Sequence, residues 1–267
     1  MHTGRPALDM ELPTPPTALL RMTALLAEPA CDLEEVGELI QADMSLAAAL
    51  LRTVNSSLFN LSGRIQTVRE AITYLGFQEV AGITLQHGLR AAFPEAPELD
   101  RLWQRAAARS ELMGVMGRAL NLDAWAAHSA GLFEECGKAL LFRHSPARYR
   151  PLWAQACADD GALRSLELDA FGASHDILGA ALCETWGLRP SAAYCVRHHV
   201  DVQATLELRG TQSHRSLCAL SALAHCVLNV PADLERAIDT LARQLDLPPD
   251  KIKAVIPLGP HRLAGAR

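Results

Sequence analysis

Four histidines in the second half of the chain carry the side chain that commonly binds zinc and nickel in proteins. They are His175, His198, His199 and His225. Neutral imidazole is a good ligand for both metals, so these side chains could form an imidazole-rich metal site. Their spacing in the sequence does not establish that they meet, and the hypothesis depends on the helices that position them.

His175 begins an expected helix in which Leu178, Leu182 and Trp186 follow at helical spacing, so its side chain should face partly inward. An inward-facing histidine is most often a structural residue whose ring is hydrogen-bonded in the core. A role in a functional site is the alternative, and both interpretations stay open here.

His198 and His199 end the helix that we expect to start near Pro190, where the helix dipole favours a protonated imidazole. At least one of them could share a groove with His175. His225 does not lie cleanly on the apolar face of its own helix, so we expect it to be partly exposed.

The segment Gly131-Leu-Phe-Glu-Glu-Cys-Gly-Lys138 places two adjacent carboxylates, Glu134 and Glu135, close to a lysine. Glu134 and Lys138 are four residues apart, which predicts an ion pair on a polar helix face. A carboxylate metal site is the alternative. Arg109 and Lys138 could bind an anion, but a solvated or ion-paired role is more usual for such side chains.

Asn55 and Ser56 stand at the expected end of a short helix. Their side chains can bond backbone groups and shape the following turn, or they can form part of an interaction surface. The sequence contains no glycine-rich phosphate loop, no Gly-x-Ser-x-Gly elbow and no evident Cys/His nucleophile pair. The sequence therefore offers none of these three catalytic or phosphate-binding signals.

Composition narrows the class of protein further. The formal net charge is −5, which argues against a general nucleic-acid-binding surface, so we expect no nucleic-acid partner. The seven cysteines have no Cys-x-x-Cys spacing, and this suits a reducing compartment. No apolar run approaches the roughly 18 residues of a membrane span, and no secretory signal is evident. We therefore expect a cytoplasmic protein without a membrane partner.

Leucine and alanine dominate the apolar residues, while aromatic residues make up only 5% of the chain, and this composition predicts an all-α fold. Phe93-Pro-Glu-Ala-Pro97 is the expected boundary between two helical parts. We expect a lead-in over 1–13, a five-helix bundle over 14–93, a larger helical part over 94–230 and a helical extension over 231–267.

Several helix ends have recognisable signals. Asp32 and Glu35, and likewise Thr67 and Glu70, have the spacing of a capping box, and either Asp43 or Ser45 should cap the helix that follows. A single helix is expected from Leu122 to His144. Another is expected over 190–199, followed by a loop or a helix extension over 200–212.

The order of motifs along the chain closely resembles the HDOD family, the HD-related output domain of bacterial signalling proteins. In the amino-terminal part the resemblance rests on Leu12-Pro13, Gln41-Ala-Asp43, Val54-Asn-Ser56 and Leu75-Gly76. In the second part it rests on Gly131-Leu132, Gly137-Lys138, Phe171-Gly172-Ala-Ser-His175, Trp186-Gly187-Leu188 and His198-His199. The similarity covers residues 12–230, which would together form one HDOD domain.

The resemblance implies a five-helix amino-terminal bundle packed on a degenerate HD-like helical bundle. In the metal-binding HD motif, His-Asp stands inside an apolar Gly-Leu-Leu-His-Asp-x-Gly-Lys helix, whereas Glu134 and Glu135 stand at those two positions here. His175 and at least one of His198 and His199 match ligand positions of catalytic relatives. His225 stands where those relatives carry an aspartate. The resemblance therefore implies regulation rather than catalysis.

The sequence thus predicts a non-catalytic regulatory module that contacts other signalling proteins and could sense a nucleotide-like ligand in a vestigial pocket. The candidate pocket residues are Arg109, Glu134, Glu135, Lys138, His175, His198, His199 and His225. No cofactor is expected, and a divalent metal, if bound, would use His175, His198 and His199. The alternative is a divergent metal-dependent phosphohydrolase that acts on a nucleotide or a cyclic dinucleotide.

Overall fold

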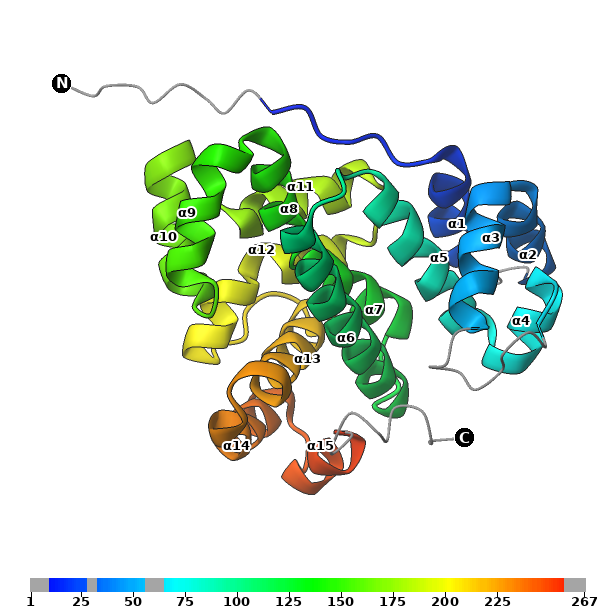
Figure 1. Ribbon diagram of the computed structural model, residues 1–267. Helices are drawn as coiled ribbons and strands as arrows, with labels where there is room; N and C mark the ends of the chain where they lie inside the picture. The colour runs from blue at the N-terminus through cyan, green and yellow to red at the C-terminus, as the bar shows by residue number, and fades with distance from the viewer. Residues whose placement is uncertain (1–9, 28–32, 56–64, 257–267) are drawn as a thin grey trace. The chain divides into compact units, whose positions relative to one another are not determined.

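The structure is a computed structural model that describes residues 10–27, 33–55 and 65–256. Every regular element in these residues is a helix, which confirms the all-α prediction (Figure 1). No helix among the described residues is both long and apolar enough to cross a membrane. The chain divides into two compact units, one built mainly from Thr14–Phe93 and the other from Pro94–Thr185 with Arg189–Ile256.

The amino-terminal unit consists of short helices whose ends follow local sequence signals. The helices are α1 (Thr17–Ala27), α2 (Leu33–Ala42), α3 (Met44–Val54), α4 (Val68–Leu75) and α5 (Phe77–Ala91). Asp43, rather than Ser45, caps α3, because its carboxylate accepts hydrogen bonds from the backbone N–H groups of Ser45 and Leu46. Asp32 lies outside the described residues.

The two ends of α4 show the expected capping chemistry with one difference. Thr67 accepts a hydrogen bond from the Glu70 N–H, but the Glu70 carboxylate accepts from the N–H of Gln66 instead of the N–H of Thr67. Gly76 ends α4 with φ +81°, a conformation that glycine adopts without strain.

Asn55 holds the end of α3 against a later part of the chain. Its side-chain amide donates to the carbonyl groups of Leu51 and Ile65, and its carbonyl oxygen accepts from the N–H of Ile65. These bonds give Asn55 a turn-shaping role. The interaction-surface interpretation of Asn55 stays a prediction, and Ser56 lies outside the described residues.

The second unit holds the longest helices and positions most of the candidate residues. Its helices are α6 (Pro97–Ala119), α7 (Ala124–Phe133), α8 (Cys136–His144), α9 (Pro146–Ala156), α10 (Asp160–Phe171), α11 (His175–Thr185), α12 (Pro190–Thr205), α13 (Gln212–Asn229), the 3₁₀ turn η1 (Pro231–Asp233), α14 (Leu234–Leu245) and α15 (Pro249–Val255). Helix α6 packs against α7 and α13, α12 packs between α11 and α13, and α8 packs against α11. Figure 1 shows α6, α7 and α8 in green and α12 and α13 in yellow to orange.

One predicted helix boundary was wrong. The expected helix from Leu122 to His144 is interrupted at Glu134 and Glu135, so that α7 ends and α8 begins there. The interruption lets α8 pack closely on α11, and it turns both glutamates into the interior.

Beyond the helix expected over 190–199, the helix-extension alternative for 200–212 holds as far as Thr205, because Val196 and Val200 extend the buried face at four-residue spacing. His198 and His199 therefore lie inside α12 and not at its end. The helix-dipole argument for their protonation does not apply.

Candidate functional site: a buried charge cluster

Glu134, Glu135, Lys138 and Arg109 are all buried, with exposed fractions of at most 1%. The prediction of a polar helix face was therefore wrong, as was the predicted partner of Lys138. The Arg109 guanidinium donates from Nη1 to Glu134 Oε2, and its Nη2 lies 3.6 Å from Glu135 Oε1. Lys138 Nζ donates to Glu135 Oε2 at 2.9 Å. Because of the break between α7 and α8, Lys138 pairs with Glu135, three residues before it, instead of with Glu134, four residues before it.

Lys138 joins a second carboxylate to this cluster. Its Nζ donates to Asp160 Oδ1 at 2.7 Å, so one buried ammonium bridges Glu135 and Asp160. At the edge of the cluster, the partly exposed Arg105 donates from Nη2 to Glu135 Oε1 at 3.2 Å. Each of the two adjacent glutamates thus has an internal cationic partner.

The charged partners determine the protonation of the cluster. Burial alone would raise the pKa of Glu135, but the charges of Lys138, Arg109 and Arg105 outweigh it and lower that pKa to about 2. Burial also opposes ionisation of Asp160, yet Lys138 holds the pKa of Asp160 well below its ordinary value. Both carboxylates are therefore ionised at neutral pH.

His175 and His199 are fully buried, and their rings lie 5.4 Å apart between centroids. His199 Nδ1 donates to the Val196 carbonyl at 2.7 Å, which makes Nδ1 the protonated nitrogen of a neutral ring. Burial lowers the pKa of His199, which favours this neutral form. His175 Nδ1 lies 2.6 Å from Glu167 Oε2. Neither Nε2 has a hydrogen-bond partner among the residues that the structure describes.

Glu167 fixes the orientation of His175. The same Oε2 also accepts from the His175 backbone N–H at 2.8 Å, and Oε1 accepts from the Tyr149 hydroxyl at 2.6 Å. Burial, followed by the nearby Glu167 charge, raises the pKa of Tyr149 well above its ordinary value, so the phenol stays protonated. Glu167 therefore acts as a buried support for the imidazole ring.

Asp160, His175 and His199 each offer one ligand atom, and these atoms lie within 4.8 Å of one another. Two imidazole nitrogens and one carboxylate oxygen are a common donor set for zinc. The hydrogen bonds from each Nδ1 to Glu167 and to the Val196 carbonyl are the outer contacts that orient metal-binding histidines. By donor type and arrangement, these three residues fit a divalent ion.

The other predicted site residues lie elsewhere or at the margin. His198 is partly exposed, and its ring lies 4.3 Å from that of Tyr194, which stacks on His214. His225 is half-buried in α13, and its Nδ1 lies 3.2 Å from the Asn229 side-chain amide. Burial and the charge of Arg109 lower the pKa of His225. The predicted set of His175, His198 and His199 thus differs from the observed cluster by Asp160 in place of His198.

Sequence reasoning missed Asp160 and Glu167, although a signal for both was present. Asp160, Leu163, Glu167 and Phe171 follow one another at three- and four-residue spacing and form the buried face of α10. Acidic residues on an otherwise apolar face must find internal partners, which marks them as candidates.

The HDOD family model matches residues 12–202 of this sequence, about seven tenths of its length. The chain belongs to the HDOD family. The buried charge cluster therefore lies in an HDOD protein.

Solved structures of similar fold are named either as signalling or HDOD proteins or as phosphohydrolases. A candidate signal transduction protein from Marinobacter aquaeolei is 20% identical, with 94% of this chain and 56% of that chain covered and a TM-score of 0.74. An HDOD domain protein of unknown function from Geobacter sulfurreducens is 21% identical, with 91% and 88% covered and a TM-score of 0.72. A candidate phosphohydrolase from Shewanella amazonensis is 16% identical, with 91% and 90% covered and a TM-score of 0.67.

The matches differ in length from this HDOD chain. It spans only 56% of the Marinobacter chain, and 37% of a curated relative from Treponema pallidum that is 23% identical over 192 residues. At these identities, the solved structures establish the shared fold. Function has to be argued from the site.

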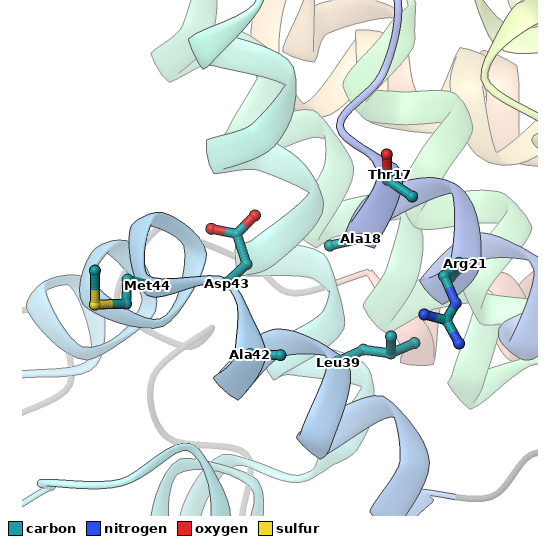
Figure 2. A pocket seen from close by; sticks show the side chains of 7 residues that line it. All are labelled: Thr17, Ala18, Arg21, Leu39, Ala42, Asp43 and Met44. Atoms are coloured by element: carbon teal, nitrogen blue, oxygen red, sulfur yellow. The ribbon is translucent and has the colours of Figure 1, made fainter.

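A hollow lies in the amino-terminal unit, between α1 and the junction of α2 and α3. Its volume is about 430 Å³, and Figure 2 shows Arg21 on α1 at one side and Asp43 at another. The Asp43 carboxylate already caps α3, and Met44 beside it is 85% exposed. The hollow is thus open and holds no cluster of buried polar groups, in contrast to the charge cluster of the second unit.

The charge cluster predicts a loss of stability in acid. Since the folded state lowers the pKa of Glu135 to about 2, its stabilising effect is full above the ordinary value of 4.5 and is lost as pH falls toward 2. The loss from Glu135 alone should be about 3 kcal/mol of unfolding free energy. Urea unfolding measures the part of this loss that falls between pH 6 and pH 3, which is about 2 kcal/mol.

Glu135→Gln should flatten the pH dependence of the unfolding free energy over this range. The matched change Glu34→Gln removes a carboxylate from an exposed pair with Arg69 and should leave the slope unchanged. Equal slopes for wild type and Glu135→Gln would show that Glu135 is not held ionised by its neighbours.

Proposed function

We propose that this HDOD protein is a non-catalytic signal-transduction module that acts by contact with other signalling proteins. One observation carries the proposal: Glu134 and Glu135 are both paired with buried cations of the chain itself. By the resemblance, these two residues stand at the ligand positions of the HD motif. A metal-dependent phosphohydrolase needs ligands that bind the ions which activate water. Here Arg109 and Lys138 compensate the charge that such ions would neutralise.

The charges of the pocket also bear on the predicted nucleotide-like ligand. Two buried cations, Arg109 and Lys138, pair with the buried carboxylates of Glu134, Glu135 and Asp160. A fourth buried carboxylate, Glu167, bonds His175 and Tyr149 instead. Even with the partly exposed Arg105, acidic groups outnumber basic ones, and the cations are already paired, so the cluster does not attract phosphate. The charges therefore favour the protein-contact part of the proposal over recognition of a phosphorylated ligand.

A divergent phosphohydrolase is the second candidate, and the cluster of Asp160, His175 and His199 favours it. The fold is also shared with the Shewanella protein that is named a candidate phosphohydrolase. In this alternative the three residues would hold a divalent ion, which would supply an activated water, and Glu167 would keep His175 oriented.

A hydrolysis assay separates the two candidates. Purified protein is incubated with bis(p-nitrophenyl) phosphate, a nucleoside triphosphate or a cyclic dinucleotide, each with Mn²⁺ or Ni²⁺. We expect the wild type and Asp160→Asn to release equal background amounts of product. Turnover by the wild type that Asp160→Asn abolishes would overturn the non-catalytic proposal.

Affinity purification from the source bacterium should in turn retain a signalling protein.

A further inference from the structure

Lys138 Nζ lies between two carboxylates, beside the three residues that could hold a metal ion. It donates to Asp160 Oδ1 at 2.7 Å and to Glu135 Oε2 at 2.9 Å, and the side chain is 1% exposed. Asp160 is at the same time one of the three residues whose ligand atoms cluster with those of His175 and His199. A single carboxylate thus belongs to both arrangements.

The donor set points to zinc as the metal that the cluster would take. Zinc bonds of about 2.1 Å bring the ligand atoms to within about 4 Å of one another, so atoms that already lie within 4.8 Å need only small shifts. His175 and His199 each have a buried Nε2 without a partner among the described residues, while both Nδ1 atoms are engaged. Each ring therefore has its free nitrogen available as a ligand.

The ammonium of Lys138 opposes such an ion. A divalent cation on Asp160 would share that carboxylate with a positive charge held in place by Glu135, away from solvent that would screen the repulsion. The lysine side chain has no exposed position within its present packing, because it is buried over its whole length. Lysine and metal therefore compete for the same negative charge.

We propose that the ammonium of Lys138, held in place by Glu135, prevents zinc from binding at a site formed by Asp160, His175 and His199. The inference goes beyond the proposed function, because it concerns the cation inside the buried charge cluster and not the protein that the surface contacts. The zinc affinities of folded variants test it, whereas the hydrolysis assay tests the proposed function, so each can fail alone.

The test uses Lys138→Met/Glu135→Gln, which removes one positive and one negative charge and leaves the three ligands in place. Zinc binding to untagged protein is measured by calorimetry in competition with a chelator. We expect the double variant to bind zinc at least about tenfold more tightly than the wild type, a difference of about 1.4 kcal/mol. Adding Asp160→Asn to the double variant should return the affinity to the wild-type level.

Glu98→Gln/Arg150→Met is the matched control, because it makes the same kinds of change in an ion pair with far greater exposure. It should bind zinc as the wild type does. If circular dichroism shows that Lys138→Met/Glu135→Gln does not fold, Lys138→Gln replaces it, since glutamine keeps an N–H donor for the carboxylates. The proposal is overturned if the folded variant binds zinc no more tightly than the wild type, or if the gain survives Asp160→Asn.

Discussion

Lys138→Met is expected to lower the free energy of unfolding by about 3–5 kcal/mol at neutral pH, because it leaves Glu135 and Asp160 as buried carboxylates without their shared counter-charge. The hydrogen bonds from Nζ to both carboxylates are lost as well. Urea unfolding, followed by circular dichroism, measures the change. An effect of this size is a large fraction of the stability of a typical domain.

The charge-balanced variant Lys138→Met/Glu135→Gln should recover part of this loss, since it removes one of the two stranded charges. Lys253→Met is the surface control: Lys253 pairs with Glu235, both side chains are exposed, and the change should leave the unfolding free energy nearly unchanged. A loss below about 1 kcal/mol for Lys138→Met would contradict the assignment of a buried ion-pair cluster.

Gly137→Ala is expected to destabilise the protein by about 3 kcal/mol or more, because the new methyl group has no space between α8 and α11. A Cβ at Gly137 would lie 1.8 Å from the backbone oxygen of His175 and 2.5 Å from its carbonyl carbon. Backbone atoms cannot move aside as a side chain can, so the two helices must separate. The separation should also disturb His175 and its bonds to Glu167.

Gly114→Ala is the control for this change, since Gly114 is a buried glycine inside α6. A Cβ there would meet the His128 side chain at 3.4 Å, an ordinary contact distance. Alanine also has a higher helix propensity than glycine, so the unfolding free energy should change by no more than about 1 kcal/mol in either direction. Comparable losses for the two variants would refute the close approach of α8 and α11.

The fold could be predicted largely because local signals agree with it. Apolar residues recur at helical spacing, Asp43 and Thr67 cap helices through their side chains, and Gly76 ends α4. The break at Glu134 and Glu135 could not be predicted from local pattern. Glutamate is a good helix former, and both residues keep helical backbone angles even at the break. The break goes together with the packing of α8 on α11, a contact distant in sequence.

The site was harder to predict than the fold because pairing of buried charges is a tertiary property. The i,i+4 spacing of Glu134 and Lys138 indicates a surface pair, yet Glu134 bonds Arg109 from α6 and Lys138 bonds Asp160 from α10. The paired His198 and His199 are equivalent by sequence, but only His199 faces the interior. Consecutive residues of a helix point in different directions, so His198 and His199 differ in burial because both lie within α12.

The metal content of untagged protein, purified without chelator and measured by mass spectrometry, tests most directly whether internal cations have replaced the metal of the HD frame. The account predicts well below one transition-metal ion per wild-type chain, and no change on His175→Ala. About one bound zinc, nickel, manganese or iron ion per chain, lost in His175→Ala, would contradict it.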